Sequence, residues 1–146
     1  MLCYVCPQNK NPVIIFNFDL DSFKQINDTQ GHHVGDEVLN AFVDILKRVF
    51  SQSAFVGRTG GDEFIVVADY EKKQDILQGI KQMQFYMNEY NTKHPMDNCK
   101  LSASYGWSDN HDQNDLNIWK VYEMADQRMY QSKISKKTKT LPQPDT

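Results

Sequence analysis

The sequence predicts an α/β fold, an α+β sandwich in which helices flank a mainly antiparallel central sheet. Three observations support this prediction. A compact, β-rich apolar run occupies residues 13–18, and two short apolar runs flank the pair Gly60 and Gly61. Segments with apolar residues at helical spacing separate these runs. The expected order is therefore strand, helices, hairpin, helix, strand, helix, in one domain without internal repeats.

The first strand is the central one. Residues 13–18 (VIIFNF) have the length and composition of a strand that is buried on both faces. Asp19 is expected to close this strand. Asp21 is then well placed to cap a short helix over residues 22–28.

A loop, a helix and a hairpin are predicted next. Residues 29–35 (TQGHHVG) form a polar loop with two glycines, and a helix begins at Asp36. Residues 54–58 and 64–68 are two short strands on either side of the Gly-Gly pair, which makes a hairpin the simplest interpretation. The apolar residues of the helix lie at helical spacing: Leu39, Phe42, Ile45, Leu46 and Val49.

Two further helices and a strand complete the fold. A long helix follows the hairpin, and His94 and Pro95 mark its end. Residues 101–107 are another strand candidate, and a last amphipathic helix leads into a basic segment that starts at Lys133. The helices are indicated by two apolar sets: Ile76, Ile80, Met83, Met87 and Tyr90, then Ile118, Val121, Tyr122, Ala125 and Met129.

These elements define the expected domain organisation. We predict a folded domain over residues 13–137, an N-terminal extension over residues 1–12 and a disordered tail over residues 138–146. The three cysteines are an odd number and cannot form a closed disulfide framework. Cys3 and Cys6 form a CxxC without two further ligands at suitable spacing, so we interpret this motif as incidental.

The composition argues against a nucleic-acid-binding protein and against a membrane-spanning segment. Sixteen basic and nineteen acidic residues give a formal charge of −3, which argues against an extended nucleic-acid surface. No stretch approaches the roughly 20 apolar residues that a membrane span requires, and no leader opens the chain. We therefore expect a soluble, cytoplasmic segment without membrane contact, although a longer parent protein could be membrane-anchored.

The hairpin turn has the composition of a metal-nucleotide site. It spans residues 58–64 (RTGGDEF). Gly60 and Gly61 lack a Cβ, so a triphosphate can lie against the backbone. The adjacent carboxylates of Asp62 and Glu63 suit Mg²⁺, which prefers one or two protein carboxylates together with phosphate oxygens. A solvated hairpin turn is the alternative, since Gly-Gly between strand-like runs is a common hairpin signal.

Asp19 supplies another acid to this region. An unpaired charge at the end of a buried strand is costly, so Asp19 requires a cation or hydrogen-bond donors. If its strand lies beside the hairpin, Asp19 forms a two-carboxylate Mg²⁺ site with Asp62 or Glu63. Those two residues would face opposite sides of a regular strand, which favours different roles for them. We interpret Asp19 as a ligand and Asp21 as a cap or supporting group.

Three further residues could bind a nucleotide. Lys24 could reach a phosphate as a point charge, although a surface lysine is the simpler interpretation. Asn27 and Asp36 flank the glycine loop. A carboxylate at Asp36 could accept hydrogen bonds from both N1–H and the 2-amino group of guanine, which favours GTP over ATP. A favourable acid in the first turn of a helix explains Asp36 equally well.

Several motifs together closely resemble the GGDEF domain of diguanylate cyclases. The resemblance covers about residues 13–137, nearly the whole domain. Its motifs are residues 19–28 (DLDSFKQIND), 31–32 (GH), 35–36 (GD), 58–64 (RTGGDEF), 101–106 (LSASYG), 125–126 (AD) and 129–133 (MYQSK).

The resemblance implies a fold similar to the palm of adenylyl cyclases and polymerases. It also implies a reaction that joins two GTP molecules into cyclic di-GMP with release of pyrophosphate. Each protomer would bind one GTP, so catalysis would require a homodimer of facing half-sites. Cyclases of this kind usually follow a sensor or receiver domain, so we expect such a fused domain in a parent protein.

Roles for the acidic residues follow from the same resemblance. Asp19 and Asp62 would be the carboxylate ligands of Mg²⁺ or Mn²⁺, and the backbone carbonyl of Leu20 would be a further ligand. Asp62 would also be the catalytic acid/base, and Glu63 would assist metal binding or proton transfer. Lys24 would stabilise charge on the phosphates.

The resemblance also implies the remaining nucleotide contacts. Asn27 and Asp36 would recognise guanine, and Lys133 and Lys137 would hold the distal triphosphate. Lys136 replaces the usual glycine of the C-terminal motif, and Lys137 stands where arginine is common.

Two family features have no counterpart in this sequence. Residues 51–54 (SQSA) occupy the position of the Arg-x-x-Asp product-inhibition motif, so we expect that inhibitory site to be absent. The twelve residues before Val13 do not resemble the helical Asp-x-Leu-Thr-Gly-Leu-x-Asn-Arg segment of the family. A catalytically silent module that binds GTP or dimerises is therefore the alternative to an active cyclase. A nucleic-acid polymerase palm is a more distant one, because the composition lacks an extended basic track.

Overall fold

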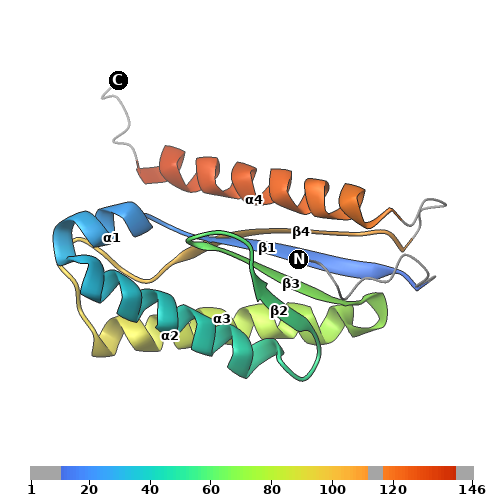
Figure 1. Cartoon of the computed structure of the whole chain (residues 1–146), viewed down its shortest axis with the longest axis horizontal. Helices are drawn as coiled ribbons and strands as arrows, with labels where there is room; N and C mark the ends of the chain where they lie inside the picture. The colour runs from blue at the N-terminus through green and yellow to red at the C-terminus, as the bar shows by residue number, and fades with distance from the viewer. Residues whose placement is uncertain (1–10, 112–116, 141–146) are drawn as a thin grey trace.

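The computed structural model describes residues 11–111 and 117–140, so Cys3 and Cys6 lie outside the described residues. The chain forms a strand, two helices, a hairpin, a helix, a strand and a last helix, in that order (Figure 1). In order they are β1 (Val13–Leu20), α1 (Phe23–Gln30), α2 (His32–Phe50), β2 (Phe55–Arg58), β3 (Glu63–Asp69), the 3₁₀ turn η1 (Tyr70–Lys72), α3 (Lys73–Lys93), β4 (Ala103–Asp109) and α4 (Ile118–Thr140).

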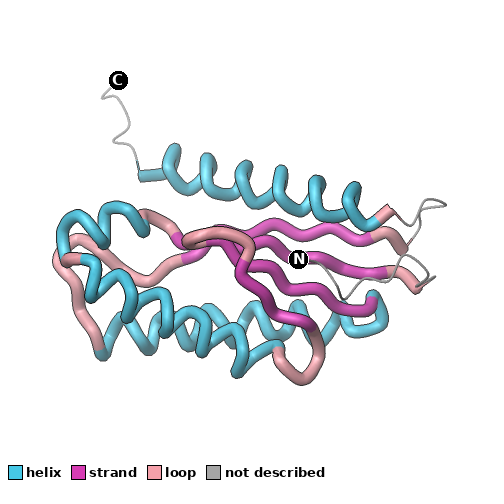
Figure 2. The backbone as a smooth tube through the Cα atoms, in the orientation of Figure 1, coloured by secondary structure: helices cyan, strands magenta, loops and turns pink. Residues whose placement is uncertain are grey.

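The four strands form one antiparallel sheet in the order β2-β3-β1-β4 (Figure 2). β1 is a central strand, and it pairs with β3 on one side and with β4 on the other. Near its end, Asp19 lies opposite Glu63 of β3 and opposite Ser104 of β4. The predicted antiparallel sheet is confirmed, as is the prediction that the first strand and the hairpin are neighbours.

Helices cover both faces of this sheet. In Figure 1, α4 lies along one face, and α1, α2 and α3 lie on the other. Successive residues of β1 alternate between the two layers. Phe16 and Phe18 belong to the large core beneath α2 and α3, whereas Ile15 packs in a smaller cluster with Val121 and Ala125 of α4. Every residue of β1 is buried, which explains its nearly continuous apolar sequence.

The contact between α4 and the sheet is closest at Gly106 of β4. A Cβ added there would lie 2.1 Å from the backbone nitrogen of Met129 and 2.5 Å from the carbonyl oxygen of Ala125. Only glycine leaves room for the helix backbone at this position. Gly106 therefore sets how deeply α4 packs against the sheet.

Several predicted boundaries were correct. The hairpin strands β2 and β3 lie where the sequence placed them, and α3 ends at Lys93, directly before the His94 and Pro95 that were expected to end it. The strand predicted over residues 101–107 is β4, shifted two residues towards the C-terminus. η1 was not predicted.

The predicted polar loop over residues 29–35 is wrong. α1 continues to Gln30 and α2 begins at His32, so Gly31 alone separates the two helices. Gly31 has φ 90°, a conformation that glycine adopts without steric cost, and this allows the abrupt change of direction. The surrounding residues are polar because they face solvent, not because they lack helical hydrogen bonds: Gly31 N–H donates to the carbonyl of Asn27, and Gly35 N–H donates to that of Gly31.

The ends of two elements also differ from the prediction. β1 extends to Leu20, so Asp19 lies inside the strand rather than closing it. The paired strands β3 and β4 continue past Phe18 and keep β1 extended. α4 runs to Thr140 and includes the first residues of the tail that was expected over residues 138–146. In the described ranges, no helix has the length and apolar character to cross a membrane.

Replacing Gly106 should test the α4 contact. We expect Gly106→Ala to lower the free energy of unfolding by about 3 kcal/mol, because the new methyl group overlaps helix backbone that has no alternative rotamer. Gly61→Ala is the matched control, since a Cβ at that turn glycine has no neighbour within 4 Å. Urea denaturation of both variants measures the difference, and equal stabilities would contradict the proposed contact.

Candidate functional site

The end of β1 and the turn between β2 and β3 form one acidic site. Asp19 lies opposite Glu63 in the β1–β3 register, and the Leu20 N–H donates to the carbonyl oxygen of Asp62 at 3.0 Å. This hydrogen bond extends the pairing of the two strands into the turn. The acids of the strand and of the turn are therefore neighbours, although more than forty positions of sequence separate them.

Arg58 holds the turn in shape. Its Nε lies 3.0 Å from the carbonyl oxygen of Gly60 and 3.1 Å from that of Gly61, and its Nη2 lies 2.5 Å from the latter. The N–H groups of Thr59 and Gly60 donate to the carbonyl of Glu63. No role was predicted for Arg58 from the sequence. An arginine two residues before a Gly-Gly pair is nevertheless a usable signal, because its five N–H donors can bind the carbonyls of the turn.

Asp19 is the most buried acid of the site. Only 8% of the residue is exposed. Burial raises the pKa of Asp19 above its ordinary value, and the nearby charge of Asp62 raises it further, although the ammonium of Lys133 opposes both. Lys133 Nζ lies 2.8 Å from Asp19 Oδ2, whereas Asp19 Oδ1 is buried without a hydrogen-bond partner. A buried carboxylate of this kind is stabilised by a cation nearby.

The two turn acids have different electrostatic neighbours. Asp62 precedes β3, and its charge acts on Asp19. Glu63 is exposed, and its charge contributes to the raised pKa of Tyr122 on α4, after burial and Asp126. The two acids therefore act electrostatically on different residues.

These residues fit a divalent cation of the Mg²⁺ type. Within the described ranges, no group of three or more His, Cys, Asp or Glu side chains is placed to hold a metal ion. Asp19 and Asp62 provide two neighbouring carboxylates, one with an unpartnered buried oxygen. Mg²⁺ uses this few protein ligands when phosphate oxygens complete its shell. Leu20 follows Asp19 at the end of β1, and its N–H donates to the carbonyl oxygen of Asp62.

Asp21 does not cap α1, so that prediction is wrong. The cap position is Ser22, which has φ 57° and makes no side-chain cap hydrogen bond. Asp21 instead accepts hydrogen bonds from the hydroxyls of Ser102 (2.7 Å) and Ser104 (2.6 Å) and from Lys136 Nζ (2.8 Å). Burial alone would raise the pKa of Asp21, but these donors outweigh it and lower the pKa. Asp21 is thus held by Ser102, by Ser104 of β4 and by Lys136 of α4, and not by the N–H groups of α1.

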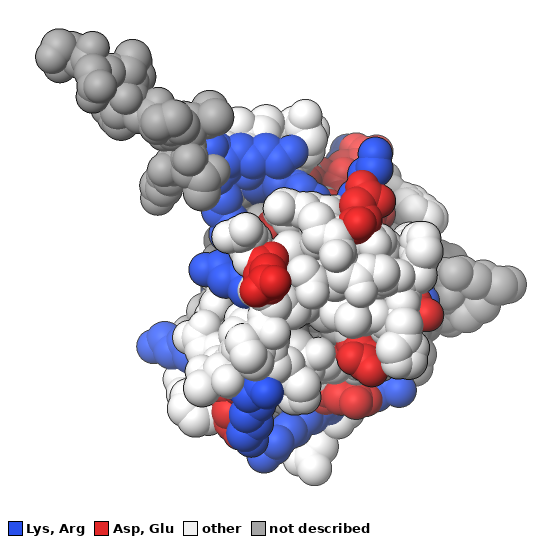
Figure 3. All heavy atoms as spheres, turned by 90° about the vertical axis from the view of Figure 1, so that its left-hand side faces the viewer, with Lys and Arg blue, Asp and Glu red and all other residues white. Residues whose placement is uncertain are grey.

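The basic residues reach the site from α4. Lys133 contacts Asp19, and Lys136 contacts both Asp21 and the carbonyl oxygen of Ala103 at 2.6 Å. Figure 3 views this end of the molecule and shows basic side chains gathered on its α4 side, with acidic side chains next to them. Lys24 and Lys137 are exposed. The contacts of Lys136 were not predicted from the sequence, because they depend on how α4 lies against the sheet.

Asn27 and Asp36 come together where α1 meets α2. A Cβ at Gly35 would lie 1.8 Å from Asn27 Oδ1, so the Asn27 amide lies directly against Gly35. Asp36 follows Gly35 in α2 and is exposed; it lies beyond the first turn of the helix, so the interpretation of Asp36 as a first-turn acid is wrong. The amide and the carboxylate therefore border the same corner of the molecule.

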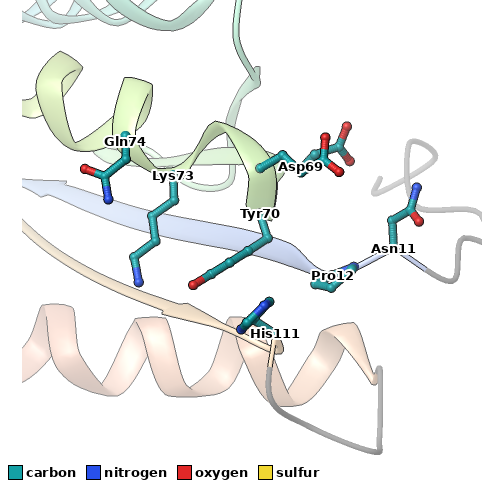
Figure 4. A pocket seen from close by; sticks show the side chains of 8 residues that line it. Asn11, Pro12, Asp69, Tyr70, Lys73, Gln74 and His111 are labelled. Carbon is teal, nitrogen blue, oxygen red and sulfur yellow. The ribbon is translucent and has the colours of Figure 1, made fainter.

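A cavity of about 460 Å³ lies at the opposite end of the sheet (Figure 4). It is lined by Pro12, Asp69, Tyr70 and His111 among others, and the rings of Tyr70 and His111 stack at 4.1 Å. Asp69 pairs with Val13 at the start of β1, so the length of that strand separates this cavity from Asp19. The cavity is not part of the acidic site.

The sequence matches one family model and is similar to proteins of known sequence. Residues 4–139 match the family model described as "Diguanylate cyclase, GGDEF domain". A diguanylate cyclase of Vibrio cholerae is 32% identical over 124 residues, which are 85% of this chain and 38% of that protein. The probable diguanylate cyclase DgcI of Escherichia coli is 35% identical over 117 residues, which are 80% of this chain and 24% of that protein. The chain thus spans well under half the length of these relatives.

Solved structures are similar as well. The active GGEEF domain of a diguanylate cyclase from Vibrio cholerae superposes with a TM-score of 0.73 at 31% identity. The match covers 88% of this chain and 81% of that one. The GGDEF domain of DgcB from Caulobacter crescentus, solved with c-di-GMP, has a TM-score of 0.72 at 24% identity and supports the fold alone.

The hydrogen bonds to Asp21 predict a pH-dependent stability. Asp21→Asn should lower the free energy of unfolding at pH 7 by about 1–3 kcal/mol, since charge-assisted hydrogen bonds are lost. A pKa lowered by folding stabilises the native state above the unfolded pKa, and this stabilisation is lost as the pH falls through the native pKa. In urea titrations the difference between wild type and variant should therefore stay constant from pH 7 to about pH 5 and shrink below about pH 4. Asp44→Asn, at an exposed aspartate of α2, is the control; a pH-independent difference would contradict the assignment.

Proposed function

The chain belongs to the GGDEF family, and from this premise we propose that it is a diguanylate cyclase domain. The reaction is the condensation of two GTP molecules into cyclic di-GMP. Each 3′-hydroxyl attacks the α-phosphate of the other nucleotide, so two phosphodiester bonds form and two pyrophosphates leave. The single observation that supports this best is the adjacency of Asp19 and Asp62 beside the Gly-Gly turn.

Asp19 and Asp62 are the residues proposed to hold Mg²⁺ or Mn²⁺, together with the carbonyl of Leu20. When bound, such a cation lowers the cost of forming a 3′-alkoxide and neutralises charge on the phosphates. Asp62 is also proposed to accept the proton of the 3′-hydroxyl. Glu63, exposed at the same turn, is placed to assist metal binding or proton transfer.

The phosphates are proposed to lie against Gly60 and Gly61, where no Cβ blocks their approach to the backbone. A Cβ at Gly61 would have no neighbour within 4 Å, which leaves this side of the turn open. Lys24, Lys133 and Lys137 are the proposed cationic contacts. Lys133 Nζ, 2.8 Å from Asp19, would exchange its carboxylate partner for a phosphate oxygen.

Guanine is proposed to bind at the corner between α1 and α2. Asp36 would accept hydrogen bonds from N1–H and the 2-amino group, and Asn27 would bond to the same base. Adenine lacks that pair of donors, so this contact selects GTP. The close packing of Asn27 on Gly35 supports a fixed orientation of the amide.

One such site binds one GTP, and the reaction requires two. A homodimer in which two half-sites face each other is therefore part of the proposal. In a longer parent protein, a fused sensor or receiver domain would control this encounter. We also propose a cytoplasmic location for the domain, where GTP is available.

The ion pair between Lys133 and Asp19 favours a second candidate function. An ammonium at the metal-binding carboxylate competes with a divalent cation, which would suit a catalytically silent module that binds GTP or dimerises. The two candidates differ in whether GTP is consumed.

A direct assay decides between them. The protein at high concentration with GTP and Mg²⁺ should form cyclic di-GMP, and Asp62→Ala should reduce the rate by at least about 100-fold, as expected for loss of an acid/base group. Product is measured by chromatography. Because half-sites must meet, the assay is repeated with a dimerising coiled coil fused to the chain. Equal product from wild type and Asp62→Ala would contradict the mechanism, and bound but unconsumed GTP in the fused dimer would favour the silent module.

Gly35 offers a test of guanine recognition that leaves Asn27 and Asp36 in the sequence. We expect Gly35→Ala to displace the Asn27 amide, because the added Cβ overlaps Asn27 Oδ1. GTP affinity should fall by about 1–3 kcal/mol, the usual value of one bidentate base contact. Calorimetric titration with GTP and ATP measures this loss and the selectivity. Unchanged GTP affinity would contradict the proposed contact between Asn27 and guanine.

A further inference from the structure

Two neighbouring residues on one face of β1 contain buried polar atoms without partners. Among the described residues, the buried side-chain atoms that lack a hydrogen bond are Asn17 Oδ1, Asn17 Nδ2 and Asp19 Oδ1. Asn17 is only 4% exposed and Asp19 only 8%. Buried polar groups in folded proteins are nearly always hydrogen-bonded, to protein or to internal water. Their occurrence together therefore requires an explanation.

The geometry of the strand places both side chains in the same layer. Residues two apart in a strand point to the same face, and Ile15, on that face, packs against α4. Asn17 and Asp19 therefore lie between the sheet and α4. The residues opposite Asn17 are Ile65 and Gly106, and neither has a polar side-chain atom that could satisfy the amide.

The two oxygens of Asp19 have different surroundings. Oδ2 accepts the hydrogen bond from Lys133, whereas Oδ1 is the unpartnered atom. Asn17 is the nearest polar residue along this face of β1. Its amide can donate to a water that in turn donates to Asp19 Oδ1.

We propose that Asn17 is a positioning residue for Asp19, linked to Oδ1 through one buried water. The link fixes the plane of the carboxylate and keeps Oδ2 directed towards Lys133, whose Nζ lies 2.8 Å away. Hydrogen-bonded partners of metal-binding carboxylates commonly orient them in this way. The inference rests on the proposed role of Asp19 as a metal ligand and adds a residue that packing alone does not require, because an apolar side chain would fill the same layer.

Two isosteric variants separate the hydrogen bond from the packing. Asn17→Val and Asn17→Thr have nearly the same shape and strand preference, but only threonine keeps a donor and acceptor. Mn²⁺ binding, measured by electron paramagnetic resonance with a non-hydrolysable GTP analogue, should weaken about 10-fold in Asn17→Val. It should stay within about 2-fold of wild type in Asn17→Thr. Ser108→Ala removes another buried polar side chain of the sheet and should not alter Mn²⁺ affinity; thermal unfolding confirms that each variant is folded.

A second measurement keeps this inference separable from the proposed function. Nuclear magnetic resonance should detect a long-lived water next to the Asn17 amide protons, and that contact should disappear in Asp19→Ala. Equal Mn²⁺ affinities of the valine and threonine variants would overturn the positioning role while leaving the cyclase proposal intact. If wild type binds no metal, the proposed function fails. Independently of metal binding, the absence of the water contact would overturn the link between Asn17 and Asp19.

Discussion

The burial of β1 on both faces is the constraint on which the rest of the structure depends. Phe16 and Phe18 point into the core beneath α2 and α3, and Ile15 points towards α4, so the strand is held from both sides. This placement brings Asp19 into the same protected layer as Ile15. A carboxylate in that position is costly unless cations or donors surround it. The neighbouring elements therefore have to supply charge as well as apolar surface.

α4 supplies both. Val121 and Ala125 in its first half complete the apolar layer over the sheet, and Lys133 and Lys136 in its second half pair with Asp19 and Asp21. The two lysines are three residues apart and therefore lie on the same side of the helix, one turn from each other. The helix that closes the second face of the sheet thus also determines the electrostatics of the acidic site.

The sequence predicts the parts of this arrangement that depend on local periodicity. The apolar run of β1, the hairpin around Gly60 and the α3 stripe were all recognised from spacing alone. The loop before Asp36 was predicted wrongly, because polar residues on an exposed helix face have the same composition as a loop. Asp21 was predicted to be a cap or a supporting group. The cap was wrong, because the donors that bind Asp21 include Ser102 and Lys136, which are distant in sequence. The sequence allowed Asp19 and Asp62 to be paired on the condition that their strands are neighbours. It did not reveal the lysine contacts of Asp19 and Asp21, which depend on how α4 packs against the sheet.

Packing between elements distant in sequence also explains why Gly106 affects the acidic site. Gly106 lets the backbone of α4 approach β4 at Ala125 and Met129, and Lys133 follows one turn after Met129. A helix held farther from the sheet would move the Lys133 ammonium away from Asp19 and remove the charge that lowers the pKa of this carboxyl. It would also open the layer that encloses Asn17. The depth of a helix on a sheet, a property of packing, therefore controls the charged neighbours and the orientation of the carboxylate proposed to bind the metal.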